Sequence, residues 1–204
     1  MTQKSDAELF AASAAGEEAA FLALYRRWQA NVYRFALRLS GSQSIAEDVT
    51  QEVFLTLVNG KARFNPELGG MAAYLYGIAR NQVLRRMKRE RIFTSLAREP
   101  DPEVEERRQP SSAAPDALAA LTRQESVALL HRAIATLPVH YREVVLLCEL
   151  HEMDYATAAR LVGCPEGTVR SRLHRARSLL LERLRGPAAE KTGVSGIEPL
   201  RCLS

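Results

Sequence analysis

The sequence contains little cysteine and no long apolar run. Its three cysteines, Cys148, Cys164 and Cys202, are too few and too irregularly spaced for a disulfide framework. The N-terminal sequence MTQKSDAELF lacks the apolar core of a signal peptide, and no segment is long and apolar enough to cross a membrane. No stretch of useful length alternates apolar and polar residues as a strand does. These absences predict an all-α, cytoplasmic protein without membrane insertion.

Charge is unevenly distributed along the chain. The formal net charge of the 204 residues is only +4, although the sequence pI is ≈ 9.1. Basic residues gather in 71–93 and 165–185, whereas the segment 99–106, EPDPEVEE, is acidic. Two basic regions separated by an acidic stretch predict two contacts with a polyanion.

Apolar periodicity predicts helices in the first half of the chain. Apolar residues recur every three or four positions over 17–39, 45–58 and 72–92, which is the spacing of one helix face. A shorter helix is expected before Gly16. Ser5 with Glu8, and Ser44 with Glu47, match the capping-box pattern that opens a helix.

The segment 94–116 divides the chain. It contains four prolines, acidic residues and a serine pair, a composition typical of a flexible linker. We therefore predict two small helical domains, residues 1–93 and 117–186. Residues 187–204 have little pattern and are expected to form a tail.

Residues 154–181 have the pattern of a helix-turn-helix. Asp154 can cap a short helix, because its carboxylate can accept from the free amides of the first turn. Gly163 can end that helix in the left-handed conformation, and Pro165 suits the first turn of the next helix. In the second helix, an apolar inner stripe leaves the other positions to polar and basic residues. The stripe consists of Val169, Leu173, Ala176 and Leu180.

An arginine-rich outer face beside an apolar stripe suits the major groove of DNA, where guanidinium groups pair with guanine edges or phosphates. The alternative is a solvated basic face on an ordinary packed helix. The order of short helix, glycine-containing turn and second basic helix favours DNA binding.

Four stretches, taken in order, resemble the small two-domain sigma factors of bacterial RNA polymerase, the extracytoplasmic-function (ECF) class. The resemblance covers nearly everything except the linker and the tail. The stretches are GEEAAFLALYRRW at 16–28, AEDVTQEVFLTLV at 46–58, AYLYGIARN at 73–81, and LPVHYREVVLLCEL with GCPEGTVRSRLHRAR at 137–150 and 163–177.

The resemblance implies roles for the first domain. The helix over 46–58 would bind core RNA polymerase, with Asp48, Gln51 and Glu52 on its polar outer face. The loop before 72–91 and that helix would bind the −10 promoter element as the duplex opens. Flipped bases need aromatic or polar partners, and the backbone needs positive charge. The candidates for the melted strand are Phe64, Asn65, Tyr74 and Asn81, and those for phosphates are Arg80, Arg85, Arg86, Lys88 and Arg89. For Phe64 and Tyr74, a core position is an equal alternative.

The resemblance also implies that the helix over 165–181 reads the −35 element. The candidates for base edges are Arg170, Ser171, His174 and Arg175, and those for phosphates are Thr168 and Arg172. Such factors are commonly held inactive by an anti-sigma partner. Whether the two domains lie apart or pack together is left open, and a closed form could arise if basic faces docked on the acidic linker.

Other chemistry receives little support from the sequence. Cys148 and His151, with Cys164 and His174 downstream, weakly resemble a zinc motif, but Cys148 is expected on an apolar face and Cys164 at a helix N-cap. Asp48 and Glu52 lack a convergent nucleophile or phosphate loop, so neither an enzyme nor a cofactor is predicted. A stand-alone helix-turn-helix regulator is the main rival, and a helical adaptor or inhibitor is the second. A stand-alone regulator has no reason to carry a 46–58 helix together with a basic 72–91 helix, and an adaptor or inhibitor would show no promoter selectivity.

Overall fold

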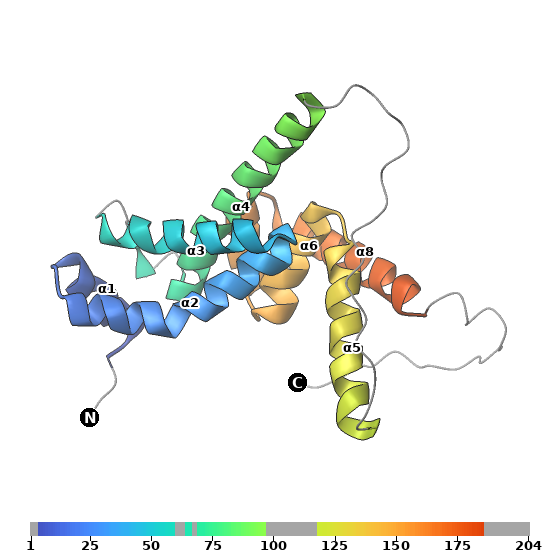
Figure 1. Cartoon of the computed structure of the whole chain (residues 1–204), viewed down its shortest axis with the longest axis horizontal. Coiled ribbons are helices and arrows are strands. Elements are labelled where there is room, and N and C mark those ends of the chain that lie inside the picture. Colours follow the sequence, from blue (N-terminus) through green and yellow to red (C-terminus); the bar gives the residue numbers. More distant parts are fainter. Residues whose placement is uncertain (1–3, 60–63, 67–68, 97–117, 186–204) are drawn as a thin grey trace.

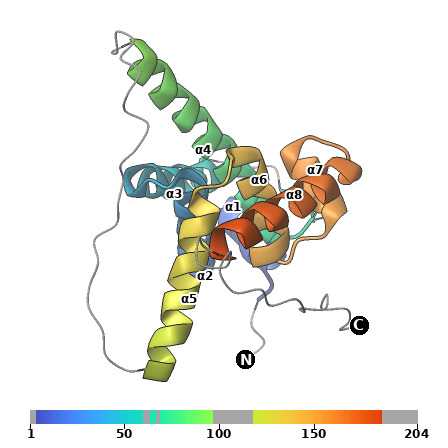
Figure 2. The same ribbon diagram turned by 90° about the vertical axis from the view of Figure 1, so that its right-hand side faces the viewer.

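The chain forms two packed groups of helices. The computed structural model describes residues 4–59, 64–66, 69–96 and 118–185. The regular elements among these residues are all helical, which confirms the all-α prediction. Figure 1 shows the first module, α1 to α4, lying against the second module, α5 to α8. The end of α4 and the start of α5 project from this body in different directions (Figure 2).

The first module consists of α1 (Asp6–Ala14), α2 (Glu18–Ser40), α3 (Gln43–Val58) and α4 (Met71–Leu96). The face of α3 predicted to be apolar is buried. Helix α4 runs to Leu96, beyond the predicted domain boundary at 93, because no glycine or proline lies between Gly77 and Pro100. The remaining linker residues, 97–116, and the tail with Cys202 lie outside the described residues. The core side chains that are completely enclosed include Leu24, Val32, Phe35, Leu39, Val49, Val53, Leu75 and Val83.

Of the two helix N-caps predicted in this module, one is confirmed and the other is wrong. Ser5 and Glu8 form the expected capping box. The N-cap of α3, however, is Ser42, whose hydroxyl accepts from the Ile45 amide, so the prediction of Ser44 was wrong. Gly41 adopts the left-handed conformation at φ 72°, which ends α2 and reverses the chain early enough for Ser42 to cap the next helix. Ser44 therefore lies inside the first turn of α3.

The second module consists of α5 (Leu118–Ala135), α6 (Val139–Val145), a π-helical turn η2 (Leu146–Leu150), α7 (Tyr155–Val162) and α8 (Glu166–Arg185). The helix-turn-helix is confirmed in its details. The Asp154 carboxylate accepts from the Thr157 amide, and Gly163 ends α7 at φ 76°. The predicted inner stripe of α8 is buried: Val169, Leu173, Ala176 and Leu180 are at most 8% exposed.

The helical segment made of α6 and η2 changes its hydrogen bonding halfway. From Leu146 the turns widen, and the His151 amide donates to the Leu146 carbonyl, five residues earlier. The wide turn ends at His151, whose ring lies against Tyr76 of the first module, with ring centroids 4.3 Å apart.

The two modules share one continuous apolar core. Helix α2 packs against α5, α6 and η2, and α4 packs against α7. We call these contacts the module junction. Arg142 of α6, only 8% exposed, anchors it: its guanidinium donates to the carbonyl of Leu39 at the end of α2 (2.8 Å) and to that of Leu137 (2.9 Å). A buried guanidinium thus satisfies carbonyls at two helix ends, one from each module.

Candidate nucleic-acid and polymerase interfaces

The outer face of α3 carries the residues predicted to bind polymerase. Asp48 and Gln51 are exposed, and Glu52 is half-buried. Asp48 is paired across the module surface, because its carboxylate accepts from the Arg86 guanidinium of α4 at 2.9 Å. The face is therefore acidic, and one of its carboxylates, that of Asp48, already forms an ion pair with an arginine of α4.

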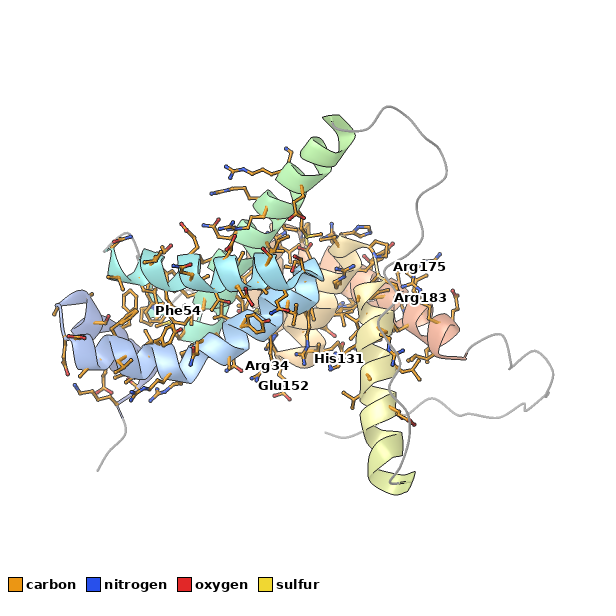
Figure 3. The ribbon with its side chains drawn as sticks, in the orientation of Figure 1. Arg34, Phe54, His131, Glu152, Arg175 and Arg183 are labelled. Carbon is orange, nitrogen blue, oxygen red and sulfur yellow. The ribbon has the colours of Figure 1, made fainter. Side chains whose placement is uncertain are left out.

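An apolar groove of about 690 Å³ lies between α2 and α3 beside these residues. The sequence prediction for this helix used only its polar positions and therefore missed the groove. Leu55 and Val58, which line it, are 45% and 57% exposed. Two large apolar side chains on the outer face of an amphipathic helix were the available signal. Figure 3 labels Phe54 within this region. The groove is lined by Phe21, Leu22, Tyr25, Glu47, Thr50, Gln51, Phe54, Leu55 and Val58.

The aromatic candidates for the melted strand pack against one another. The rings of Phe64 and Tyr74 have centroids 5.4 Å apart, and both contact Phe10 of α1 edge-on, at 5.3 and 6.2 Å. Both residues are only partly buried. Asn65 beside them is exposed. The structure thus joins the loop before α4 to α1 through a small aromatic cluster with one polar neighbour.

The basic residues of α4 fall into two groups. Arg85, Lys88 and Arg89 are exposed in the second half of α4. Arg86 and Arg80 are instead held in ion pairs, Arg86 with Asp48 and Arg80 with Glu143. Asn81 is exposed and accepts from Arg80 Nη1 at 3.3 Å.

On α8, the four residues predicted to read base edges, Arg170, Ser171, His174 and Arg175, are all exposed. Figure 3 shows Arg175 on the outer side of the helix. The Arg170 guanidinium lies 6.0 Å from the ring centroid of Tyr155 on α7. Thr168 and Arg172, predicted to contact phosphates, are partly buried beneath this face.

Glu143 of α6 connects the two predicted phosphate-binding sets. Its carboxylate, 4% exposed, accepts from Arg80 Nε of α4 at 2.8 Å and from Arg172 Nη1 of α8 at 3.4 Å. Sequence reasoning missed this residue. A carboxylate directly before the apolar run Val144 to Leu147 was the available signal, because a buried acid needs cationic partners.

Burial controls the ionisable groups of the junction. His151 Nδ1 is 2.9 Å from the Tyr76 hydroxyl, and burial together with the positive charges of Arg38 and Arg34 lowers the pKa of His151 to about 4. His131 of α5 lies 3.4 Å from Arg38, and burial likewise lowers its pKa. Both imidazoles are therefore neutral at neutral pH.

The cysteine and carboxylate patterns considered for other chemistry are dispersed. Burial, aided by the negative charges of Glu149 and Asp154, raises the pKa of the Cys148 thiol to about 11, so the thiolate is scarce at neutral pH. Within the part of the chain that the structure describes, no three His, Cys, Asp or Glu side chains come together as metal ligands. The described helices include none that is long and apolar enough to span a membrane.

Comparison with known families identifies the class of protein. The family profile for sigma-70 region 2 matches residues 24–92, and that for sigma-70 region 4 matches residues 127–180. The first match contains α3, with most of the groove lining, and most of α4, and the second contains the helix-turn-helix. A chain that carries both regions in this order is a sigma-70-type RNA polymerase sigma factor, a DNA-binding factor of transcription initiation.

Similar full-length proteins define the family more closely. The ECF RNA polymerase sigma factor SigM of Mycobacterium tuberculosis is 30% identical over 178 residues, which cover 87% of this chain and 84% of SigM. SigL of the same organism is 33% identical over 181 residues, covering 84% of this chain and 94% of SigL. This chain belongs to the ECF RNA polymerase sigma factor family.

Solved structures agree with this assignment. The sigma factor RpoE of Bartonella quintana, solved in complex with the anti-sigma factor NepR, matches with a TM-score of 0.61 and 25% identity over 82% of this chain and 98% of RpoE. The fold also matches that of CnrH, solved with the cytosolic domain of CnrY, with a TM-score of 0.63 and 21% identity over 90% of this chain and 99% of CnrH.

Proposed function

We propose that this sigma factor binds core RNA polymerase through the outer face of α3, and reads a −10 element with α4 and a −35 element with α8. The supporting observation is that one chain presents an exposed helix-turn-helix face together with a separate basic helix that is ion-paired to α3. On this proposal the protein acts in the cytoplasm, has no catalytic site of its own and directs the active site of the polymerase.

Helix α3 suits a protein partner better than a nucleic acid. Its exposed Asp48 and Gln51 flank an apolar groove, and acidic charge repels DNA backbone. Leu55 and Val58 supply apolar surface that a protein partner would remove from water. We assign polymerase binding to Asp48, Gln51 and Glu52 together with this groove.

The loop before α4 and the basic half of α4 suit a melted strand. The aromatic cluster of Phe64 and Tyr74 offers partly exposed rings on which bases can stack. Asn65, next to Phe64 in the chain, and Asn81, about two turns after Tyr74 on α4, are both exposed. The exposed cations would hold phosphates, and they would be joined by Arg80 and Arg86 once these leave their carboxylate partners. The exposed cations are Arg85, Lys88 and Arg89.

Helix α8 suits a major groove. Arg170, Ser171, His174 and Arg175 lie on consecutive turns of its exposed face, and guanidinium and hydroxyl groups are the common readers of base edges. Thr168 and Arg172 lie closer to the module body, where they would contact the backbone.

Control by an anti-sigma protein is part of the proposal. RpoE of Bartonella quintana and CnrH were solved with NepR and with the cytosolic domain of CnrY. The apolar groove on α3 provides a surface that such a partner would cover.

The test is run-off transcription with purified bacterial core polymerase on a promoter library, with and without this protein. We expect selective initiation that is lost in Asp48→Arg and retained in Glu125→Arg, a matched charge reversal at an exposed acid of α5. A melting curve checks that both variants fold. Sequence-specific DNA binding without any gain in initiation would instead make this a stand-alone regulator.

A further inference from the structure

We propose that Tyr155 of α7 is a positioning residue for −35 recognition, because its ring holds the Arg170 guanidinium in the orientation that reads a base edge. This inference deepens the proposed function and rests on it, since Arg170 is assigned there to the −35 element. Tyr155 acts through Arg170, and an ion pair between Glu149 and Arg177 supports Tyr155 in turn.

The start of α7 places Tyr155 beside the proposed reading helix. The Asp154 carboxylate accepts from the Thr157 amide at 2.8 Å, which fixes the first turn of α7, and Tyr155 is the first residue of that turn. The Tyr155 side chain is partly buried and packs against the apolar core. Both the backbone that carries the ring and one side of the ring are therefore held by the protein.

The ring of Tyr155 lies against the guanidinium of Arg170. The Arg170 Cζ atom is 6.0 Å from the ring centroid, within the distance over which a guanidinium is attracted to the face of an aromatic ring. Arg170 is exposed, and none of the ion pairs among the described residues includes it. A long side chain that is already restricted by such a contact loses less conformational entropy when it binds a base.

The hydroxyl end of Tyr155 is engaged by a second arginine of α8. Arg177, about two turns after Arg170, donates to the Glu149 carboxylate of η2 at 2.5 Å. Glu149 and, to a smaller extent, Tyr155 raise the pKa of the Arg177 guanidinium, which therefore lies beside the tyrosine hydroxyl as well. One tyrosine side chain thus connects the proposed base reader to an arginine that already has a carboxylate partner.

The two arginines therefore have different roles in this arrangement. Glu149 compensates the charge of Arg177 and keeps it within the protein, whereas Arg170 keeps its donors available for DNA. A planar guanidinium pairs with the two acceptors of a guanine edge only when its plane is correctly oriented, and a ring beside it restricts that plane. Tyr155 should consequently affect which base is preferred at one position more than how tightly DNA is held overall.

A double-mutant cycle in the full-length protein bound to core polymerase tests the proposal. The measurement is relative initiation from competing promoters in which each −35 base pair is varied in turn. Tyr155→Leu should lower discrimination about two- to fivefold at the base pair that Arg170 reads, the amount expected for an exposed cation–π contact, and leave the other base pairs unaffected. In an Arg170→Ala background the same substitution should have no further effect on discrimination.

Further variants separate the ring from the hydroxyl and from general effects on folding. Tyr155→Phe keeps the ring and should retain most of the discrimination, and Arg177→Gln should behave in the same way. Tyr33→Leu, at a partly buried tyrosine of α2, is the matched control and should leave −35 discrimination unchanged. Discrimination is a ratio within one competition, so a reduced amount of folded protein cancels. If Tyr155→Leu does not fold, Tyr155→Met fills similar space without an aromatic face.

The outcomes distinguish this inference from the proposed function. If Arg170→Ala changes discrimination at no −35 base pair, the assignment of Arg170 to a base edge fails, and the positioning role fails with it. If Arg170→Ala does change discrimination but Tyr155→Leu weakens all sequences alike, only the positioning role is overturned. A loss of discrimination by Tyr155→Leu that persists in the Arg170→Ala background would also overturn it, because Tyr155 would then act on DNA by itself.

Discussion

The two basic helices present their charges in different ways. On α8, the residues proposed to read bases face solvent on one continuous side. On α4, two of the arginines are held by carboxylates of other helices, Arg80 by Glu143 and Arg86 by Asp48. The proposed base-reading face of α8 is thus free of ion pairs with Glu143, although Arg172 of the same helix donates to that carboxylate, whereas two of the proposed phosphate contacts of α4 are engaged within the protein. On the proposed function, α8 would meet DNA with its base-reading residues already exposed, whereas Arg80 and Arg86 of α4 would first have to leave their carboxylate partners.

Substitutions in the core that the two modules share should cause the largest loss of stability. Phe35 of α2 is enclosed, stacks on Tyr76 at 4.9 Å and lies 5.8 Å from the His151 ring of the second module. Phe35→Ala should lower the free energy of unfolding by about 3–5 kcal/mol, because it removes a buried aromatic ring. Leu173→Ala should cost about 2–5 kcal/mol. Denaturant unfolding should show one transition for both variants, and two separated transitions would contradict the shared core.

Lowering the pH should separate the two modules without any mutation. In the closed state burial and two arginines lower the pKa of His151 to about 4, whereas a solvated histidine titrates near about 6.5. Between about pH 4 and pH 6.5, opening the junction is therefore accompanied by protonation of His151. The closed state thus becomes less favoured as the pH falls from about 6.5 toward 4. The closed-to-open ratio should drop by up to about tenfold per pH unit for one proton.

Scattering at constant ionic strength measures this opening. His151 faces Arg34 and Arg38 of α2 and Tyr76 of α4, and its neighbour Glu152 is exposed. His151→Phe should remove most of the response, although His131 retains a share, while His140→Gln on an exposed site should leave it intact. Opening on raising the pH would reverse the sign and reject this account.

Arginines from the two helices should differ in how they affect specificity. Arg170→Ala on α8 should cost about 1–3 kcal/mol of discrimination at one base pair. Lys88→Ala on α4 should weaken binding to all sequences alike and reduce the magnitude of the slope of log affinity against log salt by about 1. Competition binding across promoter variants and a salt series give both quantities. Equal loss on all sequences for Arg170→Ala would remove it from the base-reading set.

The smallest effect is expected at the cap of α7. Asp154→Ala should cost about 1 kcal/mol, because the Thr157 amide loses its acceptor. The bonds from Thr157 hold the pKa of Asp154 below its usual value, so the wild-type advantage is present above the unfolded pKa near about 4 and is lost as pH falls through the folded pKa. Thermal melts of both proteins over a pH series should therefore show the full difference at pH 7 and a difference that shrinks as the pH falls below about 4.

The second module could be predicted from the sequence in detail because its signals are local. A cap three residues from its amide, a glycine with positive φ and an apolar stripe all lie within one segment, and Asp154, Gly163 and Val169 occupy the predicted positions. The wrong prediction of Ser44 as the cap of α3 shows that such a local signal can miss the true position by two residues. Of the two serines near the start of α3, only Ser44 has a glutamate three residues later, yet the turn at Gly41 makes Ser42 the cap.

The junction could not be predicted, because its partners are far apart in the chain. Arg80 and Glu143 are separated by 63 positions, and Arg142 and the Leu39 carbonyl by 103. The sequence indicates that a buried arginine or glutamate needs a partner, but many basic residues could serve. The expectation that a closed form would rest on the acidic segment 99–106 concerns residues outside the described ranges, and the described junction uses other groups.

The π-helical turn η2 has a consequence for the length of the chain. In a regular α-helix each residue advances the chain by about 100°, and η2 contains one residue more than an α-helical turn would hold. Deleting a single residue there, such as the exposed Glu149, would restore regular hydrogen bonding but rotate everything that follows. His151 would leave Tyr76, and the helix-turn-helix would no longer face α4. The docking of the two modules is therefore encoded in how many residues this turn contains as well as in which residues they are.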